Sequence, residues 1–172
     1  MPEILVREAT QEDAEAMVGL TAGGWRQAYR GMVPDAYIEK LPIAGWRHDI
    51  SSGLRKPRLD AFSLIAEVDG EVAGYCFVAA PGREEPEGSK HAELVALYVD
   101  QAHWRAGIGR RLLERAVDRT RELGYQDMEL WTFDANDRAK SFYEATGWEA
   151  DEETKRPHEA SGALAIRFNL SL

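Results

Sequence analysis

Cysteine and basic charge are both scarce in this 172-residue sequence. Its single cysteine, Cys76, excludes an intrachain disulfide, and a chain of this length buries enough apolar surface to fold without one. Acidic residues outnumber Lys and Arg by 30 to 21, which leaves a formal net charge of −9. That field repels phosphate polymers and attracts cations, so we expect no nucleic-acid partner.

Long apolar runs are also lacking. None approaches the roughly 20 residues of a membrane span, and the first residues do not have the basic-then-apolar pattern of a signal peptide. We therefore expect a cytoplasmic protein with no membrane partner. Hydrophobic residues make up 44% and charged residues 30% of the chain, which is typical of a globular domain. We find no internal repeat, and the one long loop, Pro81 to Lys90, is too short to link domains, so residues 1–172 form a single domain.

The periodicity of apolar residues predicts a mixed α/β order with one central sheet. The expected elements are a strand at Ile4–Arg7, a helix opened by a Thr10/Asp13 capping box and running toward Tyr29, a helical stretch after Pro34, a hairpin of strands 62–67 and 72–79 turning at Asp69-Gly70, a strand at 94–99 buried on both faces, a helix from Ile108 to Gly124, a strand at 128–133, a helix at 137–145 closed by Gly147, and strands near Trp148 and at 164–170.

Two glycines, Gly107 and Gly109, follow the strand at 94–99 and open the next helix. Unpaired backbone amides at such a place form an anion site, and a phosphate is the natural ligand. The dinucleotide fingerprint requires a third glycine where this chain has Leu112, and the Gly-Lys-Ser/Thr of a P-loop is missing, so both common nucleotide motifs are disfavoured. A tight turn with no ligand remains the alternative.

A second informative segment, Asn136 to Trp148, follows the next predicted strand. Asn136 and Tyr143 are nearly two helical turns apart, so both can face the same side. Together the two segments resemble the GCN5-related N-acetyltransferase superfamily. Its loop pattern Gln/Arg-x-x-Gly-x-Gly/Ala is matched by Trp104 to Gly109, and its pattern Asn-x-x-Ala-x-x-Phe-Tyr-x-x-x-Gly-Phe is matched by Asn136 to Trp148. Trp104 departs from the usual Gln or Arg.

The resemblance implies a mixed, mostly antiparallel sheet that splays at the cofactor site and is flanked by about four helices. It also implies acetyl-coenzyme A in the gap between the strands ending at Val99 and Phe133, with no metal cofactor. Asn136 would contact the pantetheine arm, and Tyr143 would face the thioester sulfur. The remaining cofactor contacts would be backbone groups of two segments, namely Leu97, Tyr98 and Val99 along the strand and Arg105, Ala106, Gly107, Ile108, Gly109 and Arg110 around the pyrophosphate.

Acetyl transfer to an amine needs a base more than an acid. An alkyl amine with a pKa of about 10.4 is protonated at pH 7, and deprotonating it costs roughly 4.6 kcal/mol, whereas a thiol leaves with a pKa of about 8.5. Glu93, at the start of the strand beside the gap, is the candidate base, and a solvated strand-end carboxylate is the alternative. Tyr143 is the candidate acid for the thiolate, and a plain core aromatic is the alternative.

Other candidate residues have weaker support. Cys76 lies in an apolar strand with no neighbouring base, which favours a core position over a nucleophile. The four histidines show no metal-ligand spacing. Trp25 and Tyr29 are four residues apart in the region that forms the acceptor side in this superfamily, and substrate binding and core packing explain them equally well.

These observations predict an N-acetyltransferase that moves an acetyl group from acetyl-coenzyme A directly to an amine. The negative charge favours a small cationic amine, and a polypeptide amine remains open as the acceptor. The alternative is a non-catalytic acyl-coenzyme A sensor of the same fold, which would need the loop and Asn136 but neither Glu93 nor Tyr143. The oligomeric state is open, with a homodimer among the arrangements.

Overall fold

The computed structural model describes residues 3–80 and 90–172. Seven strands, five α-helices and two short 3-10 helices are assigned in this part of the chain. In chain order they are β1 (Ile4–Glu8), η1 (Gln11–Asp13), α1 (Ala14–Ala28), α2 (Asp35–Ile38), α3 (Ile43–Arg55), β2 (Ala61–Val68), β3 (Glu71–Ala79), β4 (His91–Val99), η2 (Gln101–His103), α4 (Ile108–Glu122), β5 (Asp127–Phe133), α5 (Asp137–Ala145), β6 (Glu149–Pro157) and β7 (Leu164–Ser171).

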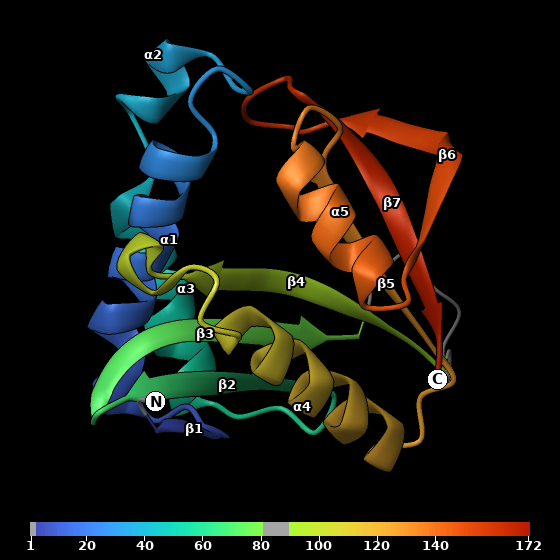
Figure 1. The fold of residues 1–172 in the computed structure, drawn as a ribbon. Coiled ribbons are helices and arrows are strands. Elements are labelled where there is room, and N and C mark those ends of the chain that lie inside the picture. Colours follow the sequence, from blue (N-terminus) through green and yellow to red (C-terminus); the bar gives the residue numbers. More distant parts are fainter. Residues whose placement is uncertain (1–2, 81–89) are drawn as a thin grey trace.

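All seven strands belong to one sheet in the order β1-β2-β3-β4-β5-β7-β6. Every neighbouring pair is antiparallel except β4 and β5, which run parallel. Figure 1 shows the sheet as two parts, β1 to β4 and β5 with β7 and β6, that meet at one end and diverge at the other. The predicted mixed, mostly antiparallel and splayed sheet is confirmed, with one helix more than expected because the stretch after Pro34 forms both α2 and α3.

The two faces of β1 to β4 are covered by different helices. Successive side chains of a strand point to opposite faces, and in β3 the buried Cys76 packs with Leu112 of α4, whereas Tyr75 packs with Met17 of α1. The sheet is therefore a layer between α4 on one side and α1 with α3 on the other. This arrangement brings the first turn of α4 and the end of α1 to the same, splayed end of β4 (Figure 1).

A β-bulge in β4 separates the two parts of the sheet. Phe77 pairs with Ala96 and Val78 with Leu94, so Val95 is an extra residue with no partner on β3. On the other edge, β4 pairs with β5 only from His91 to Leu94. The prediction of a strand buried on both faces is wrong at this point, since Val95 is 50% exposed.

Backbone geometry confirms several of the local predictions. Thr10 and Asp13 form the predicted capping box, although the first turn is 3-10 rather than α-helical. Asp69 and Gly70 have positive φ angles of 51° and 84°, as a type I′ hairpin turn requires. Helices α4 and α5 are followed by left-handed glycines, as predicted. The predicted loop Pro81 to Lys90 lies, apart from Lys90 itself, outside the described residues.

Gly74 sets how closely α4 approaches the sheet. A Cβ atom at this position would lie 3.0 Å from the Tyr98 carbonyl oxygen and 3.2 Å from both Ile108 and Leu112. Ile108 begins α4, so the absence of a side chain at Gly74 lets the first turn of this helix rest against the end of β4. The fold therefore fixes the position of that helix end through one small residue.

We expect Gly74→Ala to force α4 away from β4. Overpacking of this kind costs about 1–3 kcal/mol, and cofactor affinity should fall with stability because the loop before α4 moves as well. Thermal denaturation and calorimetric titration with coenzyme A measure the two effects. Gly53→Ala, in α3 where nothing lies within 4 Å of the added atom, is the matched control. A Gly74→Ala protein with unchanged melting temperature and affinity would contradict this account of the packing.

Candidate functional site

The loop before α4 presents backbone amides to solvent. Gly107 caps the helix with φ +84°, and Arg105 has φ +65°, a left-handed conformation that costs a non-glycine residue roughly 1 kcal/mol or more. Arg111 donates its amide to the Gly107 carbonyl at 3.1 Å, so the amides before it have no helical acceptor. The amide of Ala106 differs from the others, because it donates to the His103 carbonyl at 3.3 Å.

Only the first of the two glycines is required by the backbone. Gly107 has a positive φ, whereas a Cβ at Gly109 would meet Phe142 at 3.6 Å and Val99 at 3.8 Å, which are ordinary contacts. A tight turn therefore explains Gly107 alone. Gly109 lies at the point where the first turn of α4, the end of β4 and α5 come together.

The edge of β4 that faces β5 lacks a strand partner along Leu97, Tyr98 and Val99. Backbone groups on such an edge can pair with an extended ligand as with an added strand. One of them is already engaged, because the Val99 carbonyl accepts a hydrogen bond from Trp104 Nε1 at 2.9 Å. The predicted strand-edge residues and the predicted loop thus lie consecutively around one end of the splayed sheet.

Tyr143 reaches into this splayed region from α5. It is 9% exposed, and its ring packs edge-on against Phe142 and Trp148. Burial raises the pKa of its hydroxyl well above the ordinary value, and the nearby Tyr98 and Cys76 raise it further. The hydroxyl consequently keeps its proton at neutral pH and can serve as a hydrogen-bond donor.

Cys76 is a core residue, as the sequence favours. Its side chain is fully buried, and burial raises the pKa of its thiol to about 12. A thiol in that state is a poor nucleophile. Its Sγ lies 4.0 Å from the Leu112 carbonyl oxygen, on the side of the sheet that α4 covers.

An aromatic cluster lies next to Tyr143, on the α1 side of the splayed end. Trp25 is its centre, 7% exposed and with ring centroids 5.0 Å from Tyr29 and 5.6 Å from Phe133. Burial, with a smaller contribution from the nearby Tyr143, raises the pKa of Tyr29 to about 12. The position of Trp25 fits core packing, whereas Tyr29 extends toward the site.

His158 completes the aromatic cluster from the β6–β7 connection. Its ring lies 5.4 Å from Trp25, and the Ser161 backbone N–H donates to its Nδ1 at 3.2 Å. That bond keeps Nδ1 unprotonated, and burial lowers the pKa of the ring, so the neutral form carries its proton on Nε2. Sequence reasoning missed this residue, because no local pattern relates it to α1.

Glu93 lies at the other end of the split, where β4 and β5 still pair. It is in register with Glu129, and its pKa is raised first by burial and then by that second carboxylate. Glu129 is itself held by His91 Nε2 at 3.1 Å. The groups that shift the pKa of Glu93 are thus different from those that shift the pKa of Tyr143. The two candidate catalytic residues lie in separate parts of the split.

Asn136 caps α5. Its side-chain oxygen accepts a hydrogen bond from the Ala139 amide at 3.1 Å, and the residue is 7% exposed. This capping role is structural, and it leaves the side-chain NH₂ group for a ligand. The cap also orients the helix that carries Tyr143.

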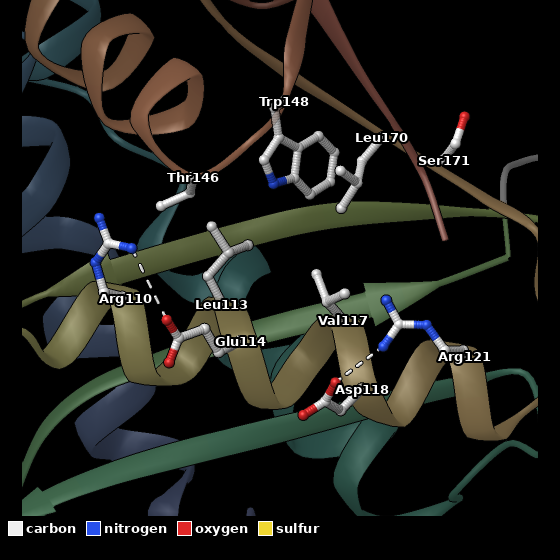
Figure 2. A pocket seen from close by; sticks show the side chains of 10 residues that line it. All are labelled: Arg110, Leu113, Glu114, Val117, Asp118, Arg121, Thr146, Trp148, Leu170 and Ser171. Atoms are coloured by element: carbon white, nitrogen blue, oxygen red, sulfur yellow. Dashed lines mark hydrogen bonds and ion pairs between the residues drawn. The ribbon is translucent and has the colours of Figure 1, made fainter.

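A surface groove of about 410 Å³ lies between α4 and the residues at the end of α5 and of β7 (Figure 2). Its walls are α4, Thr146, Trp148 and the end of β7, and Arg110 is the one predicted site residue that lines it. Figure 2 shows Arg110 and Arg121 directed at Glu114 and Asp118 of the same helix. The charges in the groove neutralise one another, and the groove lies beside the splayed region rather than within it.

No described helix has the length and apolar character needed to cross a membrane. Within residues 3–80 and 90–172, no group of three or more His, Cys, Asp or Glu side chains is arranged to hold a metal ion.

Known proteins share this arrangement. PaiA N-acetyltransferase of Thermoplasma acidophilum, solved in complex with coenzyme A, superposes with a TM-score of 0.80 over 99% of both chains at 20% identity. Mycothiol acetyltransferase of Sanguibacter keddieii is 32% identical over 117 residues, which are 66% of this chain and 37% of that protein. Spermidine N(1)-acetyltransferase of Thermoplasma acidophilum is 23% identical over 152 residues, 87% of this chain and 90% of that protein.

The structural likeness shows that the chain has the fold of the PaiA N-acetyltransferase. Residues 25–148 match the acetyltransferase (GNAT) family, and the chain belongs to that family. The resemblance found in the sequence, the fold class and the enzyme class are thereby confirmed. The chain spans 37% of the length of the mycothiol enzyme, so acceptor and residue roles are matters for proposal.

We expect Glu93→Gln to become more stable relative to wild type as pH rises. The raised pKa means that the folded chain binds this proton more tightly than the unfolded chain. The associated stabilisation is present below the unfolded pKa of about 4.3 and is lost as pH increases through the folded pKa. Glutamine removes this dependence. Melting temperatures between about pH 4 and pH 8 measure the difference, with Glu71→Gln at an exposed strand position as control. A Glu93→Gln profile that follows the control would contradict burial of the charge.

Proposed function

We propose that this chain transfers an acetyl group from acetyl-coenzyme A directly to the amine of a small cationic metabolite or of a polypeptide, within a ternary complex. The observation that carries the proposal is the continuous path from the exposed amides before α4, along the unpaired edge of β4, to the buried hydroxyl of Tyr143. A phosphate, an extended arm and a thioester fit these three parts in that order.

The donor fits the residues on chemical grounds. The amides of Gly107 to Arg110 suit a diphosphate, because unpaired backbone N–H groups donate hydrogen bonds to an anion. The helix dipole favours the anion by a further amount of about 0.3–1 kcal/mol. The free edge of β4 between Leu97 and Val99 pairs with the amides of a pantetheine arm. When bound, the donor supplies the activated acetyl group, and the protein residues orient it and handle protons.

Tyr143 acts as the hydrogen-bond donor to the departing sulfur. Its raised pKa keeps the proton in place until the sulfur gains charge. A thiol is a good leaving group with a pKa of about 8.5, so this assistance contributes modestly to the rate.

Glu93 acts as the base for the acceptor ammonium, through water because of its separation from Tyr143. Its raised pKa makes the carboxylate a better proton acceptor than an exposed glutamate. Glu93 takes one proton from the acceptor ammonium through water and passes it to solvent. The C–N bond then forms as the neutral amine attacks the thioester carbonyl, and the C–S bond breaks. The second amine proton is transferred to the departing thiolate, to which Tyr143 donates a hydrogen bond.

The acceptor is a cation before it reacts. The net charge of −9 attracts such a molecule, and Tyr29 at the border of the aromatic cluster provides a ring face for it. Relatives named for spermidine and for mycothiol act on amines of different chemistry, which is consistent with a small amine here. Incubation with acetyl-coenzyme A and panels of polyamines, aminosugars and peptides, followed by mass spectrometry, tests the class. Acetylation of no amine in any panel would contradict the proposal.

Gly109→Asp should weaken coenzyme A binding while the fold survives. The added Cβ makes ordinary contacts only, whereas the carboxylate places a negative charge beside the amides that would hold the phosphates. We expect a loss of at least about 10-fold in affinity by calorimetry. Gly53→Asp adds the same charge on α3 and should bind normally. Unchanged affinity in a folded Gly109→Asp protein would mean that the phosphates bind elsewhere.

Tyr143→Phe should lower turnover about 10²-fold with little change in coenzyme A affinity. The substitution keeps the buried ring and removes only the hydroxyl. Steady-state kinetics and calorimetry separate the two effects, and Tyr125→Phe controls for loss of a half-buried hydroxyl elsewhere. Wild-type turnover in Tyr143→Phe would restrict this residue to packing.

A further inference from the structure

Trp104, the residue that departs from the usual loop pattern, supports an arginine from another part of the chain. The guanidinium carbon of Arg138 lies 3.3 Å from the centroid of the Trp104 ring. The edge of the same ring is fixed to β4, because Nε1 donates to the Val99 carbonyl at 2.9 Å. Arg138 therefore rests on a platform held by the strand end, through a cation–π contact that the planar guanidinium favours.

The position of Arg138 on α5 places it beside the loop before α4. Arg138 and Phe142 are four residues apart, so they share one face of the helix. Phe142 is the side chain that a Cβ at Gly109 would meet, so this face of α5 is directed at the first turn of α4. The Trp104 platform, which directly precedes Arg105, brings the guanidinium to the same place.

Arg105 and Arg138 lie close enough for their charges to interact. Burial lowers the pKa of Arg138, and the neighbouring Arg105 lowers it further, as a nearby like charge does. Within residues 3–80 and 90–172, neither guanidinium lies within 4.0 Å of a carboxylate. Most other described arginines form ion pairs with carboxylates, as expected where acidic residues are in excess. The first turn of α4, which lies beside Arg105, contains no acidic residue.

Two guanidiniums that have no carboxylate within 4.0 Å in the described part of the chain, next to free backbone amides, form a site for an anion with several oxygens. Each can donate charge-assisted hydrogen bonds, and the repulsion between them is relieved when a phosphate lies between or beside them. The stacking on Trp104 reduces the number of rotamers that Arg138 would lose on binding. The surroundings thus favour a phosphate rather than a neutral ligand.

We infer that Arg138, positioned by Trp104, binds a phosphate group of the coenzyme A donor beside the loop Arg105 to Gly109. This inference rests on the proposed function. The phosphate is either the diphosphate or the ribose phosphate of the donor, and both present the same chemistry to the guanidinium.

Titration of Arg138→Gln with coenzyme A, dephospho-coenzyme A and pantetheine tests the inference. A charge-assisted hydrogen bond corresponds to about a 10- to 100-fold change in affinity, and we expect a loss of that size for coenzyme A. A loss that persists with dephospho-coenzyme A identifies the diphosphate, and a loss confined to coenzyme A identifies the ribose phosphate. Pantetheine should bind both proteins equally. Arg55→Gln, which removes an exposed positive charge at the end of α3, is the matched control.

Trp104→Leu tests the positioning role of the ring. It should weaken coenzyme A binding while leaving pantetheine affinity unchanged, and the loss should not add to that of Arg138→Gln in the double variant, because both act through one guanidinium. Arg138→Lys, which keeps the charge without the planar fork, should recover part of the affinity. Additive losses, or an equal loss with pantetheine, would show that Trp104 acts on β4 instead.

Two outcomes overturn the assignment of Arg138. One is wild-type coenzyme A affinity in a folded Arg138→Gln protein, and the other is an equal loss for all three ligands. Failure of the proposed function is distinguishable from both, because in that case the wild-type protein itself would bind neither coenzyme A nor pantetheine.

Discussion

The bulge at Val95 is the constraint on which the rest of the site depends. One extra residue in β4 reverses the alternation of side chains, so Leu94 and Leu97 both pack on the α4 side although they are three positions apart. The same residue bends β4 away from β5 and leaves its edge without a partner. A regular strand would have continued the parallel ladder, and the space that we propose for the donor would be filled by the sheet itself.

The edge of β4 that faces β5 has backbone groups without strand partners, and another residue satisfies one of them. Backbone N–H and C=O groups left without partners in a half-buried region destabilise the protein unless water or a ligand satisfies them. Trp104 satisfies one of them, because its Nε1 donates to the Val99 carbonyl at 2.9 Å. Burial also raises the pKa values of Tyr143 and Glu93, so the tyrosine keeps its proton and the carboxyl group binds a proton more tightly than an exposed glutamate does.

Local chemistry in the sequence was sufficient to predict most of the elements and the loop. Asp69-Gly70 indicates its hairpin because both positions accept positive φ angles, and Gly107 indicates a left-handed cap for the same reason. The bulge could not be predicted, since Leu94 to Val99 is a uniformly apolar run in which an extra residue leaves no trace. Glu93 was identified from its strand, but its pairing with Glu129 depends on the parallel register of two strands that are distant in the chain. Arg138 on Trp104 and His158 beside Trp25 are equally non-local contacts, which one sequence cannot reveal.

The short ladder between β4 and β5 determines how firmly the two parts of the sheet are joined. Strands β4 and β5 share four residue pairs, from His91–Asp127 to Leu94–Leu130, and the Lys90 carbonyl just before β4 also accepts from the amides of Gln126 and Asp127. Helix α5 meets the other part through side chains, since Phe142 lies beside Gly109 and Arg138 rests on Trp104. An extended molecule that pairs with the free edge of β4 while touching α5 becomes a shared structural member of both parts. Binding of such a molecule would therefore raise the free energy needed to separate the two parts of the sheet. Without it, local opening between β4 and β5 would cost less.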